Sequence, residues 1–404
     1  MVQRAYHTEL DPTNVQRTAL RQHAGCARFA YNFGLQRKEE TWWLNQLPVP
    51  RIKNPTAIDL HREINSRKQS DLGWMYESSK CAPQEALRDL DRAFKNFFEG
   101  RAKYPRFHSR RSGRSSFRLT GAVKVEDGHI TLPRIGRVRL KERGYPPAEV
   151  RLRSVTASER SGRWYVSVAV EEERPLVASP TGGVVGVDLG IDVLATVSDG
   201  RVIENPRAFM ARQRKLQHLQ REVSRKRKGS HNREKARDRL SRCHAKVADL
   251  RTDAIHKATT MLARAKPVIV VESLRPANML RNHSLARSLS DASFGEFVRQ
   301  LEYKCRWYGS RLVKVDPFYP STKQCSRCGN VKEEMPLSER VYRCAKCGFV
   351  LDRDLNAARN LARVAASSAE TENACGEMAS RSREVLAPPQ GIRNPASLAP
   401  AANV

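Results

Sequence analysis

The sequence predicts a multidomain protein of the α/β class. Its 404 residues are enough for two or three domains, each with a core of its own. From residue 184 to residue 315, short apolar segments of strand length alternate with longer segments of helical periodicity. Before residue 180 the two patterns are segregated, with helical segments first and strand segments afterwards. We therefore expect an α/β unit in the second half of the chain and a separate helical and β unit in the first.

The first half begins with one predicted strand, residues 1–10, followed by helical periodicity over residues 11–105. Residues 106–180 consist of short strand segments, with a hairpin turn at Asp127-Gly128. We expect these strands to form a small antiparallel β-barrel. The helical bundle is then an insertion after the first strand of that barrel.

The charge of the chain points to a polyanionic partner. Lys and Arg number 73 against 43 Asp and Glu, a formal net charge of +30, and nucleic acid is the usual partner of such an excess. No apolar run is long enough to span a membrane, and the N-terminus has no apolar signal core. We expect no membrane association and a location in the reducing prokaryotic cytoplasm, to which nine cysteines without a disulfide framework are suited.

Residues 101–118 interleave cations with aromatic rings. Cations can contact the phosphate backbone and rings can stack on bases, so the segment favours contact with RNA or DNA over an ordinary solvated loop. The candidate contact residues are Arg106, Arg110, Arg111 and Phe117.

Two CxxC pairs, Cys325/Cys328 and Cys344/Cys347, are separated by a spacer that suits two zinc knuckles. A glycine follows the second cysteine of each pair, where a knuckle needs a residue without Cβ strain. Four unrelated buried thiols, or one redox dithiol, are the alternatives, but neither accounts for both pairs. We expect a closed, structural Zn²⁺ site with four thiolate ligands.

Separated carboxylates fall at the ends of predicted elements. Asp188 lies in an apolar strand, Glu272 ends another, and Asp352 and Asp354 precede an Ala-rich helix. Taken singly, Asp354 could simply cap that helix and Glu272 could face solvent. Together they suit a two-metal phosphodiesterase site of the ribonuclease H-like kind, with Mg²⁺ held by hard oxygen ligands.

The motifs GVDLG, IVVESL and the paired CxxC with DRDLNAARN resemble the three RuvC motifs and the zinc ribbon of the TnpB proteins of insertion sequences, which are relatives of the type V CRISPR nucleases. The segments YNFGLQRKEE, APQEALRDLDRAFKNFF, YPRFHSR and SFRLTGAVKV also resemble that family, so the resemblance extends from residue 1 to about residue 365.

The resemblance implies a division of the chain into known parts. These are a β-barrel wedge domain (1–10 and 106–180), a helical recognition domain (11–105), a RuvC-like nuclease domain (181–320 and 351–367), a zinc ribbon that binds target nucleic acid (321–350) and a disordered tail dispensable for the chemistry (368–404).

The resemblance also implies an activity, that of an RNA-guided DNA endonuclease acting as a monomeric ribonucleoprotein. Its partners are a guide RNA from the transposon end and double-stranded target DNA carrying a short adjacent motif. Matched motif by motif, the catalytic carboxylates are Asp188, Glu272 and Asp354, with Asp352 in reserve. Lys80 and Gln84 correspond to the part of the family that reads the adjacent motif.

Two other functions stay open. One is a guide-free nuclease or transposase of the same fold, and the other is a non-catalytic RNA-binding regulator of transposition. The acidic residues at all three motif positions count against the regulator.

Overall fold

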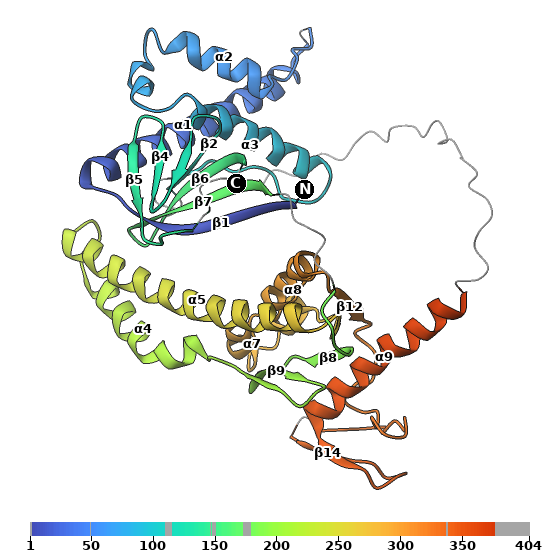
Figure 1. Ribbon diagram of the computed structural model, residues 1–404. Coiled ribbons are helices and arrows are strands. Elements are labelled where there is room, and N and C mark those ends of the chain that lie inside the picture. Colours follow the sequence, from blue (N-terminus) through green and yellow to red (C-terminus); the bar gives the residue numbers. More distant parts are fainter. Residues whose placement is uncertain are drawn as a thin grey trace.

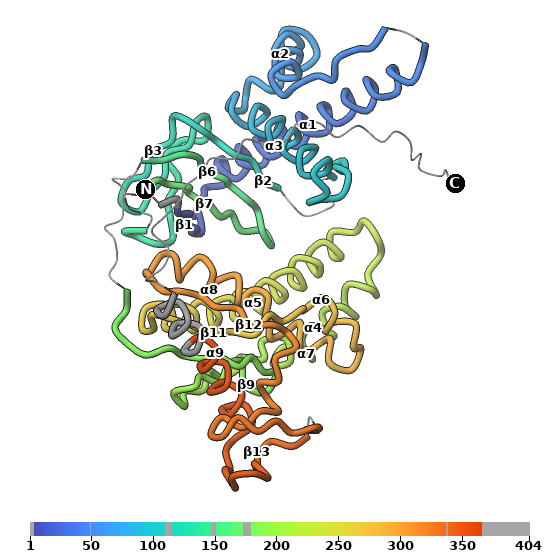
Figure 2. Tube along the Cα trace, turned by 90° about the vertical axis from the view of Figure 1, so that its right-hand side faces the viewer, coloured from blue at the N-terminus to red at the C-terminus, as the bar shows by residue number. Residues whose placement is uncertain are grey.

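The computed structural model confirms a mixed α/β chain with several sheets (Figure 1). The residues that it describes are 2–48, 50–109, 115–145, 147, 151–172, 179–336 and 338–375. Figures 1 and 2 show one body with the first sheet and helices α1 to α3 and a second body with the remaining elements. No helix in the described part of the chain combines the length and the apolar character needed to cross a lipid bilayer.

The first sheet is organised around β1 (Val2–Asp11). Its residues Val2–Glu9 pair with β7 (Arg163–Glu172), while Leu10 and Asp11 pair with β5 (Gly136–Leu140), all antiparallel. The other strands are β2 (Ser115–Leu119), β3 (Lys124–Glu126), β4 (His129–Leu132) and β6 (Arg151–Arg160), and the strand order is β2-β6-β7-β1-β5-β4-β3. Among the described residues the edge strands β2 and β3 do not pair with each other, so hydrogen bonds do not close this sheet into the predicted small antiparallel β-barrel.

Four helical segments follow β1 in the chain, and the first and last of them cover one face of this sheet. They are α1 (Asn14–Leu44), α2 (Ala57–Arg67), the 3-10 helix η1 (Gly73–Glu77) and α3 (Cys81–Phe98). A capping box at Thr13 and Gln16 starts α1. Leu20 of α1 and Ala82 of α3 share a core cluster with Trp164 of the sheet. Helices α1 and α3 thus pack directly on the sheet, between whose strands they are inserted in the sequence.

The second sheet has the order β10-β9-β8-β11-β12. Its strands are β8 (Val185–Asp188), β9 (Val193–Val197), β10 (Val202–Glu204), β11 (Val268–Glu272) and β12 (Arg311–Val315). The strands β8, β11 and β12 are parallel, whereas β9 and β10 run antiparallel to their neighbours. Parallel strands end at the same edge of a sheet, so β8 and β11 bring their terminal residues together.

Both faces of the second sheet are covered, as its nearly continuous apolar strands require. Ile269 and Val271 of β11 pack toward α5 (His231–Ala265) and α8 (Phe294–Tyr308). Val270, between them, packs on the other face against Leu361 of α9 (Arg353–Cys375). The remaining helices are α4 (Ala208–Arg225), which forms a hairpin with α5, and the short α6 (Pro276–Met279) and α7 (Ala286–Ala292).

A small two-stranded sheet, β13 (Val341–Arg343) and β14 (Val350–Asp352), leads straight into α9. It lies at the opposite end of the molecule from α2 in Figures 1 and 2. The boundary predicted for the tail, residue 368, is too early, because the helix continues to Cys375. Residues 376–404 lie outside the described part of the chain.

Candidate active site and nucleic-acid interface

Two of the predicted catalytic carboxylates end neighbouring parallel strands. Val270 pairs with Gly186 and Val271 with Val187, and the next step of this register sets Glu272 beside Asp188. In both strands the preceding residues are buried, while the terminal acid is only half-buried. The apolar strands therefore fix the position of two acids whose side chains still reach the edge of the sheet.

The third carboxylate, Asp354, comes from the first turn of α9. This helix crosses β8 at Gly186 with almost no space between the backbones. A Cβ atom at Gly186 would lie 2.0 Å from the carbonyl oxygen of Ala358 and 2.6 Å from the amide nitrogen of Ala362. Since no side chain separates helix and strand, the start of α9 is held next to the end of β8.

Burial and the neighbouring acids both shift the pKa of Asp188. Burial raises it, and the charges of Asp354 and Glu272 raise it further, to about 8, against the opposing effect of Arg353. Burial also raises the pKa of Glu272. Carboxylates held together against their mutual repulsion form a site that favours a divalent cation.

Among the described residues, the oxygens of these three carboxylates do not all lie within 4.8 Å of one another. A site for two ions does not require that they do, because the ions themselves stand about 3.5–4 Å apart and each carboxylate need touch only one.

The side chains of Asp352 and Asp354 make different hydrogen bonds. One oxygen of Asp352 accepts the backbone N–H groups of Asp354 and Leu355, both at 3.0 Å, so Asp352 caps α9. The alternative in which Asp354 caps the helix is therefore wrong. The carboxylate of Asp354 instead accepts a hydrogen bond of 3.1 Å from Nε of Arg353, whose guanidinium also donates to the carbonyl oxygen of Glu339 at 3.3 Å.

The four predicted zinc ligands converge. All four Sγ atoms lie within 4.8 Å of one another, with 3.7 Å between Cys325 and Cys347 and 3.5 Å between Cys328 and Cys344. The two knuckles have the same backbone geometry: Gly329 and Gly348, at φ 77° and 70°, each donate to the carbonyl oxygen of the first cysteine of their pair. In the described part of the chain, no other group of His, Cys, Asp and Glu is gathered in this way.

The thiols also share their protons unevenly. Backbone N–H groups, that of Cys347 first, lower the pKa of Cys344 to about 6. The N–H of Phe349 acts in the same direction on Cys347, but burial and contact with the three other thiols raise its pKa to about 12. A bound cation would relieve the repulsion among four thiolates held this close together.

Two asparagines of α9 attach the cysteine cluster to the helix that carries Asp354. Asn356 donates to the carbonyl oxygen of Gln324 at 2.7 Å and accepts the N–H of Ser326 at 2.9 Å. Asn360 donates to the carbonyl oxygens of Ser321 and Gln324 at 2.8 and 2.6 Å. This role was not predicted from the sequence, although two asparagines four residues apart on an Ala-rich helix were a visible signal.

The residues predicted to contact nucleic acid differ in how exposed they are. Lys80 is exposed immediately before α3, Gln84 is half-buried one turn later, and Arg106 is exposed. Arg110 and Arg111 lie outside the described residues. The expectation that Phe117 stacks on a base is wrong, because this side chain is only 3% exposed within the core of the first sheet.

The basic-aromatic segment is tied to α1. The side chain of Asn32 donates to the carbonyl oxygen of His108 at 2.9 Å and accepts its N–H at 2.7 Å, and the Tyr31 ring stacks on the His108 ring. Tyr104 and Phe107 of the same segment are exposed. These two rings are therefore better candidates for stacking than Phe117.

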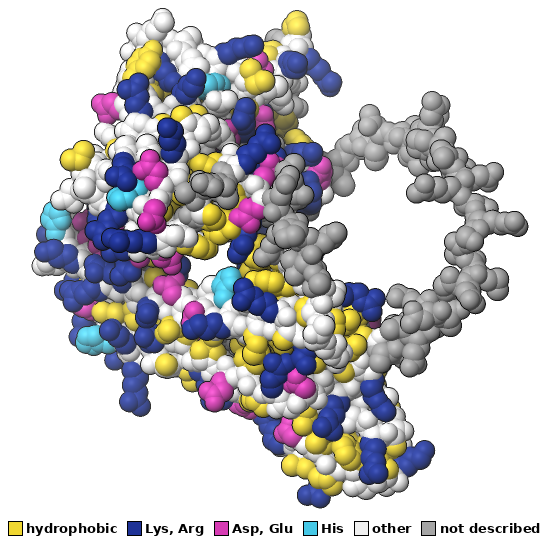
Figure 3. All heavy atoms as spheres, viewed as in Figure 1, with side chains coloured by type: hydrophobic (Ala, Val, Ile, Leu, Met, Phe, Trp, Pro, Cys, Tyr) yellow, Lys and Arg dark blue, Asp and Glu magenta, His cyan; other side chains and the backbone are white. Residues whose placement is uncertain are grey.

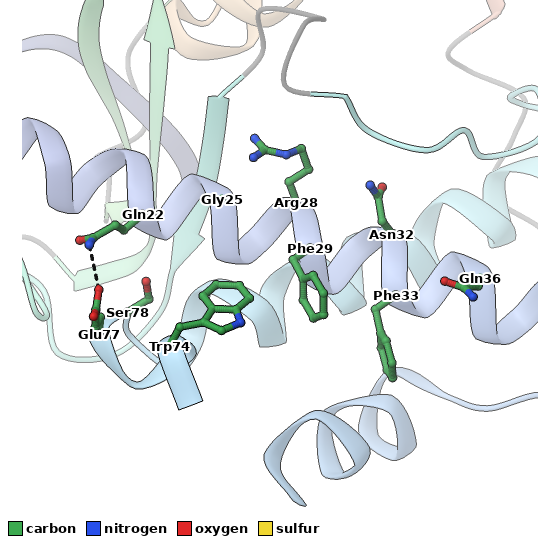
Figure 4. A pocket seen from close by; sticks show the side chains of 10 residues that line it. All are labelled: Gln22, Gly25, Arg28, Phe29, Asn32, Phe33, Gln36, Trp74, Glu77 and Ser78. Carbon is green, nitrogen blue, oxygen red and sulfur yellow. Dashed lines mark hydrogen bonds between the residues drawn. The ribbon is translucent and has the colours of Figure 1, made fainter. Parts of the chain in front are cut away.

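An aromatic groove of about 650 Å³ runs along α1 and η1 (Figure 4). Phe29 and Phe33 lie on one side of α1 with Trp74, while Arg28 and Asn32 project from the other side. The Phe29 and Trp74 rings meet edge to face, with centroids 5.4 Å apart. The aromatic rings of this groove form a second candidate surface for base stacking.

Basic side chains gather at the tip of the α4–α5 hairpin and over the adjoining end of the first sheet (Figure 3). The two bodies touch here: Arg160 forms an ion pair of 3.0 Å with Asp249 of α5, and the hydroxyls of Ser161 and Ser241 lie 2.8 Å apart. The hairpin thus joins the two bodies through contacts of α5.

Known families match three parts of the chain. They are described as "Probable transposase" over residues 167–283, "Cas12f1-like, TNB domain" over 294–361 and "Helix-turn-helix domain" over 1–46.

Two curated relatives span almost the whole chain. A Streptomyces pristinaespiralis protein named "Putative RNA-guided DNA endonuclease" is 39% identical and covers 93% of this chain and 92% of its own length. The similarly named InsQ of Escherichia coli K12 is 34% identical, over 95% of this chain and 97% of its own. Among solved structures, a Cas12f1 complex with single guide RNA and target DNA covers 90% of this chain and 99% of its own, at 15% identity and a TM-score of 0.34.

Proposed function

This chain belongs to the TnpB family, and we propose that it is a transposon-encoded, RNA-guided endonuclease that hydrolyses target DNA. Relatives that carry this activity in their names match it at 34–39% identity over nearly their full length. The observation that carries the proposal is the meeting of Asp188, Glu272 and Asp354 at one edge of the second sheet.

We assign the second sheet and its helices to a RuvC-like nuclease domain, with a zinc ribbon inserted before α9. The strand order, with three parallel strands and two antiparallel ones, supports this assignment. The first sheet then serves as the wedge domain and α1 to α3 as the recognition domain. A monomeric ribonucleoprotein is the simplest assembly that these parts suggest.

The carboxylate site fits Mg²⁺, since it offers hard oxygen ligands whose repulsion a cation relieves. When bound, the ions would supply activation of water and stabilisation of the leaving oxygen. Asp188 and Glu272 would hold them from the strand ends and Asp354 from α9. Arg353 would keep the Asp354 carboxylate oriented through its 3.1 Å hydrogen bond, while Asp352 secures the first turn of the helix.

The cysteine cluster fits structural Zn²⁺, because four convergent thiols leave no open coordination position. We expect a serine at Cys325, Cys328, Cys344 or Cys347 to lower the zinc content from one ion per chain to nearly none, as measured by elemental analysis after washing with chelator. Cleavage should fall as well, since metal-binding energy here is folding energy and the ribbon is attached to α9.

Cys81→Ser is the matched control, because this half-buried thiol lies outside the cluster and only donates to the carbonyl oxygen of Thr120. It should keep both zinc and activity. Full zinc content in all four ligand variants would show that the cluster is not the zinc site.

Guidance by RNA distinguishes the proposed function from a guide-free nuclease. Purified with RNA from its own locus, the protein should cut duplex DNA that matches the guide and lies next to one short motif, and a new guide should redirect the cut. Binding alone decides nothing, because a net charge of +30 ensures some affinity for any nucleic acid. Equal cutting of matched and unmatched DNA, or cutting without RNA, would favour the guide-free nuclease.

We also propose that Lys80 and Gln84, at the start of α3, read the adjacent motif, and that Arg106 contacts the nucleic-acid backbone. Lys80→Ala combined with Gln84→Ala should weaken discrimination between DNA with and without the motif, measured as relative cleavage rates. The affinity for guide RNA, measured in parallel, should stay close to that of the unchanged protein. Loss of RNA affinity without loss of discrimination would contradict this assignment.

A further inference from the structure

A separate cleft of about 450 Å³ lies in the first body, between the end of α2, η1, the start of α3 and the turn that joins β4 to β5. Every charged side chain that lines it is a cation: Lys68, Lys80 and Arg134. Within the described part of the chain, no carboxylate forms an ion pair with any of the three. Three elements thus bring positive charge to one hollow without balancing it.

Lys68 is the most unusual of these residues, since its side chain is only 8% exposed. Its ammonium donates to the side-chain oxygen of Asn65 at 2.8 Å and lies 5.9 Å from the centroid of the Tyr76 ring. Burial lowers its pKa. Burying an ammonium without an opposing charge is unfavourable because the group loses its hydration, and an anion bound beside it would offset that loss.

The surroundings strengthen the positive potential. Burial lowers the pKa of neighbouring His61, and the charges of Lys68, Arg88 and Lys80 lower it further. The amino end of α3, directly after Lys80, has no acidic residue in its first turn and no side-chain cap. The helix dipole therefore adds partial positive charge on the same side of the cleft.

Arg134 stands at the rim of the cleft on a strained backbone. Its φ of 64° is in the left-handed region, which is unfavourable for a residue other than glycine. The turn is closed by a hydrogen bond of 3.1 Å from the N–H of Ile135 to the carbonyl oxygen of Leu132. Such strain is retained where the position of a side chain matters, and here it keeps a guanidinium beside two lysines.

We propose that this cleft binds one backbone phosphate of the target DNA duplex, with Lys68 and Arg134 as contact residues that the family motifs do not assign. The proposal rests on the proposed function, because it identifies the ligand as the duplex whose adjacent motif Lys80 and Gln84 face. Three cations without a paired carboxylate favour phosphate as the ligand of this cleft. Duplex DNA is favoured as the source of that phosphate, because Lys80, which lines the cleft, is also one of the two residues that we propose read the adjacent motif.

The test is the salt dependence of DNA binding by the ribonucleoprotein, measured without Mg²⁺ so that nothing is cut. Lys68→Met and Arg134→Gln each remove one charge at similar side-chain length. We expect each to lower the slope of log affinity against log salt by about 0.9, the value for one lost phosphate contact on B-DNA. Arg62→Gln, on exposed α2 outside the cleft, is the matched control and should leave the slope unchanged.

A neutral methylphosphonate, moved along the duplex next to the motif, identifies the phosphate. At one linkage the methylphosphonate should weaken the binding of the duplex by the unchanged protein. At that same linkage it should cause no further loss of affinity in the Lys68→Met protein. Unchanged salt slopes, or additive losses at every linkage, would overturn the proposal. Equal slope changes with guide RNA in place of duplex would also overturn it, by moving the contact to RNA.

Thermal unfolding of the free protein separates binding from structure, since a purely structural Lys68 predicts a less stable Lys68→Met protein with unchanged salt slopes. Guide-programmed cutting by the unchanged protein is scored separately. Its absence would count against the proposed function alone, whereas unchanged slopes in a protein that cuts as programmed would count against the cleft alone.

Discussion

Asp188→Asn should abolish DNA cleavage and leave the affinity of the ribonucleoprotein for its target nearly unchanged. The substitution keeps the shape of the side chain but removes the charge at the centre of the carboxylate cluster, on which the acids of β11 and α9 both act. Single-turnover cleavage and equilibrium binding on the same preparations measure the two effects. Loss of binding in parallel with cleavage would assign Asp188 to the fold instead of the chemistry.

The same substitution has a second expected effect, on the stability of the metal-free protein. The folded pKa of Asp188, about 8, lies above its ordinary value of 3.8, so the folded state binds a proton more tightly than the unfolded chain. Its contribution to stability is full below the unfolded pKa and is lost as pH rises from about 4 to 8. In chelator at pH 8, Asp188→Asn should therefore unfold at a higher temperature than the unchanged protein, and the difference should shrink toward pH 4.

Asp352 and Asp354 provide the internal comparison. Asp354→Asn should be as inactive as Asp188→Asn, because its carboxylate belongs to the cluster. Asp352→Asn should keep much of its activity, since asparagine also caps helices well and the role of Asp352 is to accept two backbone N–H groups. An inactive Asp352→Asn protein with an active Asp354→Asn counterpart would reverse the assignment.

The sequence allowed the convergence of the four cysteines and the strand-end positions of two acids to be predicted because their signals are local. The CxxC pairs with their glycines specify two knuckles almost independently of the rest of the chain, and an acid at the end of an apolar strand is visible as such. The choice of Asp354 over Asp352 as the catalytic acid stays a prediction, and only the structure shows that Asp352 caps α9. Which acid accepts the helix N–H groups depends on the residue at which α9 begins.

The sequence was less informative about which residues lie on the surface and about whether the first sheet closes into a barrel. Phe117 looked like a stacking residue because cations surround it, yet it shares the buried face of β2 with Leu119, an alternation that was present in the sequence. The open edges of the first sheet could not be predicted, since pairing between strands far apart in the chain depends on where α1 and α3 pack. The cleft at Lys68 was hidden for the same reason, as its cations come from three separate elements.

The second large effect should come from a residue without any side chain. Gly186→Ala places a Cβ atom 2.0 Å from a backbone oxygen of α9 and 2.6 Å from a backbone nitrogen. Backbone atoms inside a helix cannot rotate away as a side chain could, so α9 itself must shift by an ångström or more. Asp354 would move with the helix, and a displacement of about 1 Å in an active site can cost 10²-fold in rate.

We therefore expect Gly186→Ala to reduce the rate of target cleavage by at least about a hundredfold, and Gly186→Val to reduce it further. Zinc content and binding of guide RNA should persist, because the nearest described neighbours of a Cβ atom at this position belong to α9 and not to the cysteine cluster or the first body. Gly183→Ala is the matched control three residues earlier, where an added Cβ meets no atom within 4 Å. It should cut at the normal rate, and so a normal rate in Gly186→Ala would mean that the distance between β8 and α9 does not set the position of Asp354.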